Sequence, residues 1–433
     1  MSCENAKRFN NHSGGFPSKY DKLGGMIKRL LAFSLLVFPA SAASLPSAKP
    51  EDAGMSSARL HRIHDTIQSH IDSHDIAGAV TLVARRGRVV HFEAHGTMDR
   101  EANKPMPKNA MFWIASMSKP VTGAAIMMLL EEGKVRLKDP VSKFIPEFKD
   151  TKVAMPIEGS VPPAFYQLPA SREITIQDLL THVSGLLSGG RAGAAEMEKV
   201  RRKPDENLAA YIPRLGSIPL DFQPGSRWTY SPGAAFDTLG RIVEIASGQT
   251  FDAFLRQRIF EPLGMQDITF HPIADARQRV AMSYRRAGGA LEKAGNDTWL
   301  SNSVYQSGAG GLFSTAEDYL QFGQMLLNGG ELRGARLMSP RTVDLMSSVH
   351  APDTLPGRGK GRGFGLSVQV VNDAVAAGYR VSNGSYGWDG AFGTHFWVDP
   401  KEKVVGVMMI QTTNPNRELD RDFENAVMQA ILE

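Results

Sequence analysis

An apolar run from Val121 to Leu130 is the feature that most restricts how this chain can fold. It is dense in Ala, Met, Ile and Leu and contains no helix breaker after Gly123. These residue types favour an α-helix, and a run with so little polar surface predicts a buried one. We therefore expect a core helix around which the rest of the chain is organised.

Ser116 and Lys119 lie three residues apart in the segment that enters this helix. Residues at that spacing share a helix face, so the serine hydroxyl and the lysine amine can meet. A hydroxyl beside an amine is the arrangement of a nucleophile and its base. No other serine is followed three residues later by lysine, and the Gly-x-Ser-x-Gly elbow is absent. Ser116 is the candidate nucleophile, although so short a pattern is weak evidence alone.

Strand-like runs near both ends of the chain predict a single sheet. A hairpin is expected at 78–84 and 89–94, and later strands at 365–371, 379–382, 392–398 and 404–410. Helices are expected at 56–69, 176–180, 236–246, 251–260 and 419–432, whereas 146–169 and 204–233 are rich in Pro and Gly and predict irregular loops.

This order of elements indicates an α/β protein of the α+β type. An antiparallel sheet built from both chain ends would carry helices on its faces, and the middle of the chain would form a mostly helical second lobe. The sheet lobe is expected at about 54–130 and 305–433, and the helical lobe at about 131–304. The cleft between the lobes is the expected site.

Residues 1–42 are expected to be an upstream extension and a signal peptide. Lys28 and Arg29 precede an apolar stretch at 30–38 and the small residues of 40–42, which is the order of a secretory signal. Met26 is then a plausible start, and the folded protein at 43–433 would be exported, periplasmic or secreted, without a stable membrane anchor. The alternative is a helix that anchors the chain loosely.

The net charge of +4 lies in this leader, which holds six basic and two acidic residues, whereas the remainder holds 43 of each sign. The balance disfavours a nucleic-acid partner. Cys3, the only cysteine, also lies in the leader, so the mature chain would have no disulfide and no cysteine ligand.

Two further segments have the chemistry that acyl transfer requires. Tyr230 precedes the helix expected at 236–246, and a tyrosine hydroxyl near a lysine amine can move a proton between nucleophile and leaving group. The segment 386–393 is rich in Gly just before an expected strand, where backbone N–H groups can bind an oxyanion. Alone, each could be structural: a buried aromatic beside a proline, and an aromatic turn.

Together these segments resemble the serine β-lactamase and penicillin-binding-protein superfamily, in the branch of the class C β-lactamases and family VIII carboxylesterases. The resemblance runs from about residue 54 to the end of the chain and includes the segments 179–186, 230–240, 308–318 and 331–339. The Ser-x-x-Lys pattern is a known signature of that superfamily.

The resemblance implies the roles of the site residues. Ser116 would be the acylated nucleophile, Lys119 its base or proton relay, and Tyr230 the second acid/base. The oxyanion would lie between the N–H groups of Ser116 and Ala391. Trp388, Asp389 and Gly390 would bind substrate, and no cofactor and no metal are implied.

Departures from the β-lactamase pattern favour an ester substrate. Tyr230-Ser231-Pro232 stands where those enzymes have Tyr-x-Asn, and Trp388-Asp389-Gly390 replaces a cationic motif. Asp389, if it points into the site, would repel the carboxylate of a β-lactam. We expect a small carboxylic ester with a short acyl group.

The sequence also leaves other functions open. The nearest alternative is a class C-like β-lactamase or D-amino-acid peptidase that uses the same three residues, and a non-catalytic binding protein on this fold is a third. A metal site formed by His61, His64, His70 and His74 is not expected, because no Cys accompanies them. The oligomeric state does not follow from the sequence.

Overall fold

The computed structural model describes residues 44–160, 164–190, 196–295, 304–416 and 418–433. The expected signal peptide therefore lies outside the described residues. Within those residues, no helix is both long enough and apolar enough to cross a membrane.

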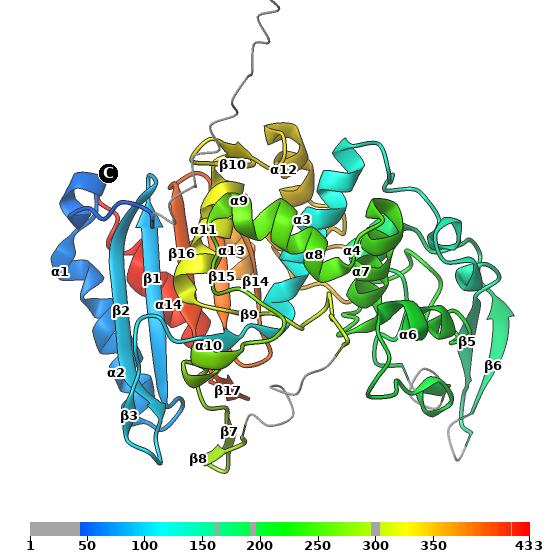
Figure 1. Cartoon of the computed structure of the whole chain (residues 1–433), viewed down its shortest axis with the longest axis horizontal. Helices are drawn as coiled ribbons and strands as arrows, with labels where there is room; N and C mark the ends of the chain where they lie inside the picture. The colour runs from blue at the N-terminus through cyan, green and yellow to red at the C-terminus, as the bar shows by residue number, and fades with distance from the viewer. Residues whose placement is uncertain (1–43, 161–163, 191–195, 296–303, 417) are drawn as a thin grey trace, which may run out of the picture. The chain divides into compact units, whose positions relative to one another are not determined.

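One eight-stranded antiparallel sheet is the centre of the fold (Figure 1). Its strands, in spatial order, are β12 (Arg362–Phe364), β13 (Gln369–Val371), β14 (Tyr386–Asp389), β15 (His395–Asp399), β16 (Val404–Met409), β1 (Gly78–Arg85), β2 (Arg88–Asp99) and β3 (Lys104–Pro105). Strand β1 pairs with both β2 and β16, with Val80 opposite Met409. The first and last parts of the described chain thus meet at the middle of the sheet, which confirms the predicted fold class.

Alternating side chains send the two faces of the sheet into different cores. Val80, Leu82 and Val407 belong to the core that contains α3 (Ser118–Glu131) and α11 (Ala316–Leu327). Ala79, Val83 and Met408 pack instead with α1 (Ser57–Leu60), α2 (Arg62–Asp72) and α14 (Leu419–Met428). The sheet therefore separates α3 from α2 and α14.

Helices predominate over strands in the described middle of the chain, as expected. Its helices are α4 (Ile176–Leu180), α6 (Leu208–Leu215), α7 (Ala234–Ser247), α8 (Phe251–Leu255), α9 (Glu261–Leu263) and α10 (Ala274–Gln278), and η6 (Arg256–Phe260) continues α8 as a π-helix. Later helices are α12 (Pro340–Ser347) and α13 (Ala374–Ala377). Short 3₁₀ turns are η1 (Pro50–Ala53), η2 (Ala115–Met117), η3 (Val141–Lys143), η4 (Pro146–Phe148) and η5 (Glu198–Val200).

Small sheets lie outside the main one. They are formed by β5 (Lys152–Ile157) with β6 (Ala164–Pro169), β4 (Phe112–Trp113) with β9 (Phe313–Ser314), β10 (Glu331–Leu332) with β11 (Ala335–Arg336), and β7 (Tyr284–Ala287) with β8 (Ala290–Lys293) and β17 (Thr412–Thr413). The β5–β6 pairing corrects the prediction of an irregular loop at 146–169. The strand expected at 379–382 is also wrong, because α13 ends at Gly378 with a φ of 70° and no strand follows until Tyr386.

Helix α3 is the predicted core helix. Every residue from Ser118 to Leu129 is buried. The turn η2 precedes it, so Ser116 lies in a 3₁₀ turn and Lys119 in the first turn of the α-helix. Ala115 has a φ of 43°, an unusual conformation for a non-glycine residue directly before Ser116.

Candidate active site

The structure brings Ser116, Lys119 and Tyr230 together. The Lys119 amine lies 3.1 Å from Ser116 Oγ, and the Tyr230 hydroxyl donates to the same oxygen at 2.6 Å. Ser116 and Tyr230 are half-buried, whereas Lys119 is wholly buried. One hydroxyl oxygen is thus held between an amine and a phenol, with a path to solvent.

The surroundings of Lys119 favour its neutral form. Burial lowers the pKa of its amine to about 7, against a smaller opposing effect of Asp237. Nζ also lies 2.8 Å from the carbonyl oxygen of Pro232 and 2.7 Å from that of Ala309. A neutral amine has two N–H groups, which satisfy these two carbonyls, and its lone pair then faces the Ser116 hydroxyl. The geometry suits a base.

Tyr230 is placed as a proton donor. Burial raises the pKa of its hydroxyl to about 12, although the hydrogen bond to Ser116 acts in the opposite direction. The phenol therefore stays protonated at neutral pH, and its short bond to Ser116 Oγ is a donated one. Lys119 is the better candidate for the base and Tyr230 for the acid.

Asp237 is a buried residue of this site that the sequence analysis missed. Its carboxylate accepts hydrogen bonds from the hydroxyls of Tyr305 and Ser307 and from the N–H of Ala309, at 2.8, 2.7 and 3.0 Å. These bonds fix the segment whose Ala309 carbonyl accepts from Lys119. An acidic residue inside the apolar stretch 234–243 of α7 is the signal that could have pointed to it.

An aromatic wall stands beside Tyr230. Trp388 lies 5.6 Å from the Tyr230 ring and 5.1 Å from that of Phe364, and Phe364 in turn lies 5.7 Å from Trp228. The guanidinium of Arg358 stacks on Trp228 at 4.4 Å. Of this wall, the sequence analysis selected only Trp388.

His182 holds the Tyr230 segment from beneath. Its Nδ1 accepts from the Ser231 N–H at 3.2 Å, and its ring lies 4.7 Å from that of Tyr230. Burial lowers the pKa of this imidazole well below its usual range, so it stays neutral. Its contacts are those of a positioning residue.

Not all residues of the segment 386–393 have the substrate-binding role that was predicted for them. Strand alternation places Trp388 on the α11 face and Asp389 on the α14 face, where Asp389 Oδ1 lies 2.6 Å from Nδ1 of His395. The condition that Asp389 points into the site is therefore not met. Gly390 serves packing, since a Cβ there would lie 2.5 Å from the carbonyl oxygen of Ile114.

Ala391 lies where an oxyanion donor could stand. The turn that contains it is fixed against η2, because Gly390 N–H donates to Thr394 O at 2.7 Å and Thr394 Oγ1 donates to Ile114 O at 3.3 Å. Ala391 is exposed, and its N–H makes no hydrogen bond to any residue that the structure describes. The amide is free to bind a substrate oxygen.

Comparisons with known proteins identify the family of this chain. The model of the Beta-lactamase family matches residues 63–430. Protein Rv1367c of Mycobacterium tuberculosis is 35% identical over 361 residues, covering 80% of this chain and 88% of that protein. Esterase EstB of Burkholderia gladioli is 32% identical over 404 residues, covering 86% of this chain and 94% of EstB. The solved structure of EstCE1, described as a hydrolase with promiscuous acyltransferase activity, aligns with a TM-score of 0.73 at 27% identity, covering 86% of this chain and 99% of EstCE1.

Proposed function

The chain belongs to the Beta-lactamase family, and within that family we propose that it is a serine carboxylesterase. One observation carries the proposal: Ser116 Oγ lies between a buried amine at 3.1 Å and a phenol that donates to it at 2.6 Å. The relative EstB, which matches most of this chain, is named an esterase. The substrate is a small carboxylic ester, and nucleic acid is not a partner.

The reaction consists of two acyl transfers. Lys119 accepts the proton of the Ser116 hydroxyl, and Oγ attacks the ester carbonyl. The N–H groups of Ser116 and Ala391 stabilise the oxyanion. When the intermediate collapses, the C–O bond to the alcohol breaks, and Tyr230 donates its proton to the departing oxygen. Tyr230 regains a proton from the Lys119 ammonium, and water then attacks the acyl-enzyme and gives its proton to the neutral amine. The C–O bond to Ser116 breaks, the carboxylic acid leaves, and Ser116 Oγ takes the proton back from Lys119.

The aromatic wall supports an ester rather than a β-lactam. Trp388 faces Tyr230 at the position where β-lactamases of the resembled branch have a cationic residue, so position 388 offers a substrate apolar contact in place of a charge for a carboxylate. Because Asp389 turns to the other face, its carboxylate does not contribute to this preference. A short acyl group remains our preference.

Labelling and kinetics with the purified chain test the proposal. We expect a fluorophosphonate to label Ser116, and p-nitrophenyl butyrate to be hydrolysed faster than nitrocefin or a D-Ala-D-Ala peptide. Ser116→Ala should remove both label and turnover, whereas Ser226→Ala, an exposed serine, should keep them. Faster turnover of nitrocefin or the peptide would instead indicate a lactamase or peptidase. No label and no turnover of any substrate would favour a binding protein.

We also propose that the protein is exported, on the basic-apolar-small order of residues 28–42. Intact mass of the protein recovered outside the cytoplasm of its native host should place the first residue near Ala43. A mature chain that retains Tyr20 would contradict the proposal.

A further inference from the structure

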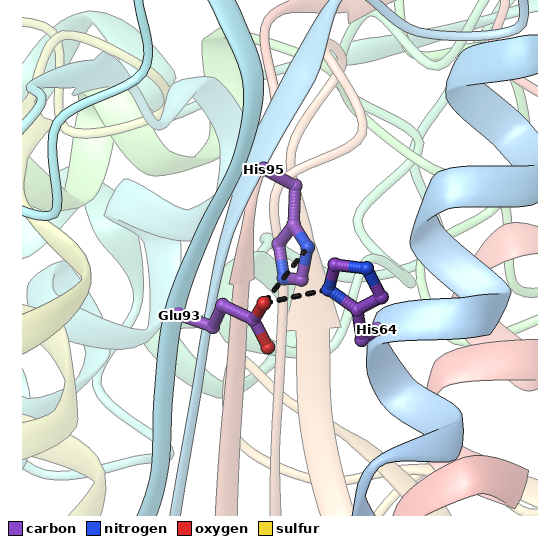
Figure 2. A group of neighbouring side chains, drawn as sticks. All are labelled: His64, Glu93 and His95. Atoms are coloured by element: carbon purple, nitrogen blue, oxygen red, sulfur yellow. Dashed lines mark hydrogen bonds and ion pairs between the residues drawn. The ribbon is translucent and has the colours of Figure 1, made fainter.

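Four side chains of types that can bind metal ions lie on the α2 face of the sheet, away from the active site. His91, Glu93 and His95 occupy alternate positions of β2, so all three project to one face. Helix α2 lies against that face and contributes His64 (Figure 2). Because α3 packs on the opposite face, the sheet stands between this cluster and Ser116.

One ring nitrogen of His64, one ring nitrogen of His95 and one carboxylate oxygen of Glu93 lie close together. Nδ1 of His64 lies 2.6 Å from Oε1 of Glu93, and Nδ1 of His95 lies 3.9 Å from the same oxygen. All three ligand atoms lie within 4.8 Å of one another. Figure 2 shows these two contacts, from one Glu93 oxygen to a ring nitrogen of His64 and to a ring nitrogen of His95.

The environment of His95 Nδ1 indicates a ligand-binding role for this cluster. Its side chain is wholly buried, and Nδ1 has no hydrogen-bond partner among the residues that the structure describes. A separation of 3.9 Å from Glu93 is too long for a hydrogen bond. A buried polar atom without a partner is costly, and this one is aimed at a carboxylate oxygen.

Thr81 of β1 holds the other nitrogen of His95. Its Oγ1 lies 2.9 Å from Nε2 of His95 and 2.8 Å from Nε2 of His91. A hydroxyl that accepts from His95 and donates to His91 satisfies both contacts and leaves an unprotonated lone pair on His95 Nδ1. In this tautomer a cation can bind the Nδ1 lone pair and the Glu93 oxygen together, whereas without a cation the opposite tautomer directs an Nδ1–H toward that oxygen. Such a hydrogen bond to the distal ring nitrogen is typical of metal-bound histidine.

We propose that His64, Glu93 and His95 bind a divalent transition-metal ion, Zn²⁺ in the first place. Two imidazoles and one carboxylate suit Zn²⁺, and water completes its coordination. Tetrahedral bonds of about 2.0–2.1 Å place ligand atoms roughly 3.3 Å apart, so the His64–Glu93 distance opens and the His95–Glu93 distance closes. His64 and Glu93 are 39% and 35% exposed, which leaves them room to adjust and gives the ion an entry path.

The site differs from the histidine set considered in the sequence, because only His64 of those four residues contributes a ligand atom. His70 is buried and bonded to Asp75 and Asp422, at 2.9 and 3.1 Å. His61 stacks on His64 at the surface. The ligands come instead from one helix and one strand, so a bound ion ties α2 to β2. An ion that binds only the folded chain raises its melting temperature.

Metal titration of the EDTA-treated chain, purified without a polyhistidine tag, tests the proposal. We expect one equivalent of Zn²⁺ to bind, a higher Tm with Zn²⁺, and a visible absorption band when Co²⁺ replaces it. His64→Gln and Glu93→Gln should remove all three signals. Thr81→Val, which deletes only the supporting hydroxyl, should weaken binding about 10–100-fold. His74→Ala changes an exposed histidine just after α2 and should leave binding unchanged.

Ester hydrolysis by each variant shows that the chain is folded and is expected to be unaffected by EDTA. Zn²⁺ binding that persists in His64→Gln and Glu93→Gln would overturn the proposal, and so would the absence of saturable binding to the wild-type chain. In the second case the cluster is a His–Glu ion pair only.

Discussion

At the scale of single residues, Lys119 controls how activity should depend on pH. Its amine must be neutral to accept the Ser116 proton, and its pKa is lowered to about 7 by burial. We expect kcat/KM for p-nitrophenyl butyrate to rise with pH, to reach half its maximum near pH 7 and to level off about one unit higher. No fall is expected on the alkaline side until Tyr230 ionises, because the pKa of that hydroxyl is about 12. A profile that is flat from pH 5 to 9 would exclude Lys119 as the base.

Removing the phenol hydroxyl tests the acid. Tyr230→Phe deletes the group that donates to Ser116 Oγ at 2.6 Å. We expect kcat for p-nitrophenyl esters, whose leaving group needs little protonation, to fall less than kcat for alkyl esters, for which a loss of about 10²–10⁴-fold is expected. Equal losses for the two ester classes would contradict the role of Tyr230 as the acid to the leaving group.

Asp237 should act through Lys119. Its carboxylate raises the pKa of Lys119 and fixes the Ala309 segment. Asp237→Asn removes the negative charge that raises the pKa of Lys119. We therefore expect the acid limb of the pH profile to lie at lower pH than in the wild-type enzyme, together with a lower kcat. Asp65→Asn, at an exposed aspartate, should change neither. A lower kcat with no shift in the acid limb would show that Asp237 only fixes the Ala309 segment and does not affect the pKa of Lys119.

The proximity of Ser116, Lys119 and Tyr230 was predictable from the sequence because each lies in a short motif at or just before the start of a helix. The orientation of neighbouring side chains was less predictable. Whether Asp389 faces the substrate depends on the register of β14 with β15, and the motif alone does not fix that register. Asp237 was missed because its partners at 305–309 lie far along the chain.

At the scale of elements, the packing of α3 makes Gly123 a sensitive position. A Cβ there would lie 2.0 Å from Oγ and 2.6 Å from Cβ of Ser367. Gly123→Ala favours the helix intrinsically, but we expect the clash to dominate and to lower the free energy of unfolding by about 1–3 kcal/mol. Urea unfolding measures the change.

A second substitution serves as the internal control. Ser367 has a φ of 77°, which glycine adopts without strain. The double variant Gly123→Ala/Ser367→Gly should therefore recover most of the lost stability. Gly240→Ala, whose Cβ would meet Leu208 at 3.3 Å, should cost less than Gly123→Ala. A double variant no more stable than Gly123→Ala would show that another contact causes the loss.

Elements were predictable where local signals agreed. Helix α4 has the predicted bounds, because apolar residues follow a capping box formed by Thr175 and Asp178. The β5–β6 hairpin was missed because most of its residues are exposed or half-buried and lack the alternation of a buried strand. Short apolar runs such as 379–382 do not by themselves distinguish a strand from a loop that follows a helix.

At the scale of the whole molecule, Arg85 joins distant parts of the described chain. Its buried guanidinium donates to the carbonyls of Ala53, Gly54, Glu402 and Glu433. Arg85→Met would leave the Ala53 and Glu402 carbonyls without a donor among the described residues, and we expect a loss of about 3 kcal/mol in urea unfolding. Arg88→Met, an exposed position on the neighbouring strand, should cost much less. Similar losses in the two variants would contradict this role.

The antiparallel sheet was predictable as a whole because strand patterns cluster at both ends of the sequence.

The pairing of a strand near the start of the described chain with a strand near its end has a consequence for biosynthesis. Val80 pairs with Met409, so β16, the second partner of β1 beside β2, is made only after more than 300 further residues. At about 5–20 residues per second, a ribosome needs tens of seconds for that interval. During this time the nascent chain exposes the apolar surfaces of β1 and α3, and chaperones must protect it until synthesis is nearly complete.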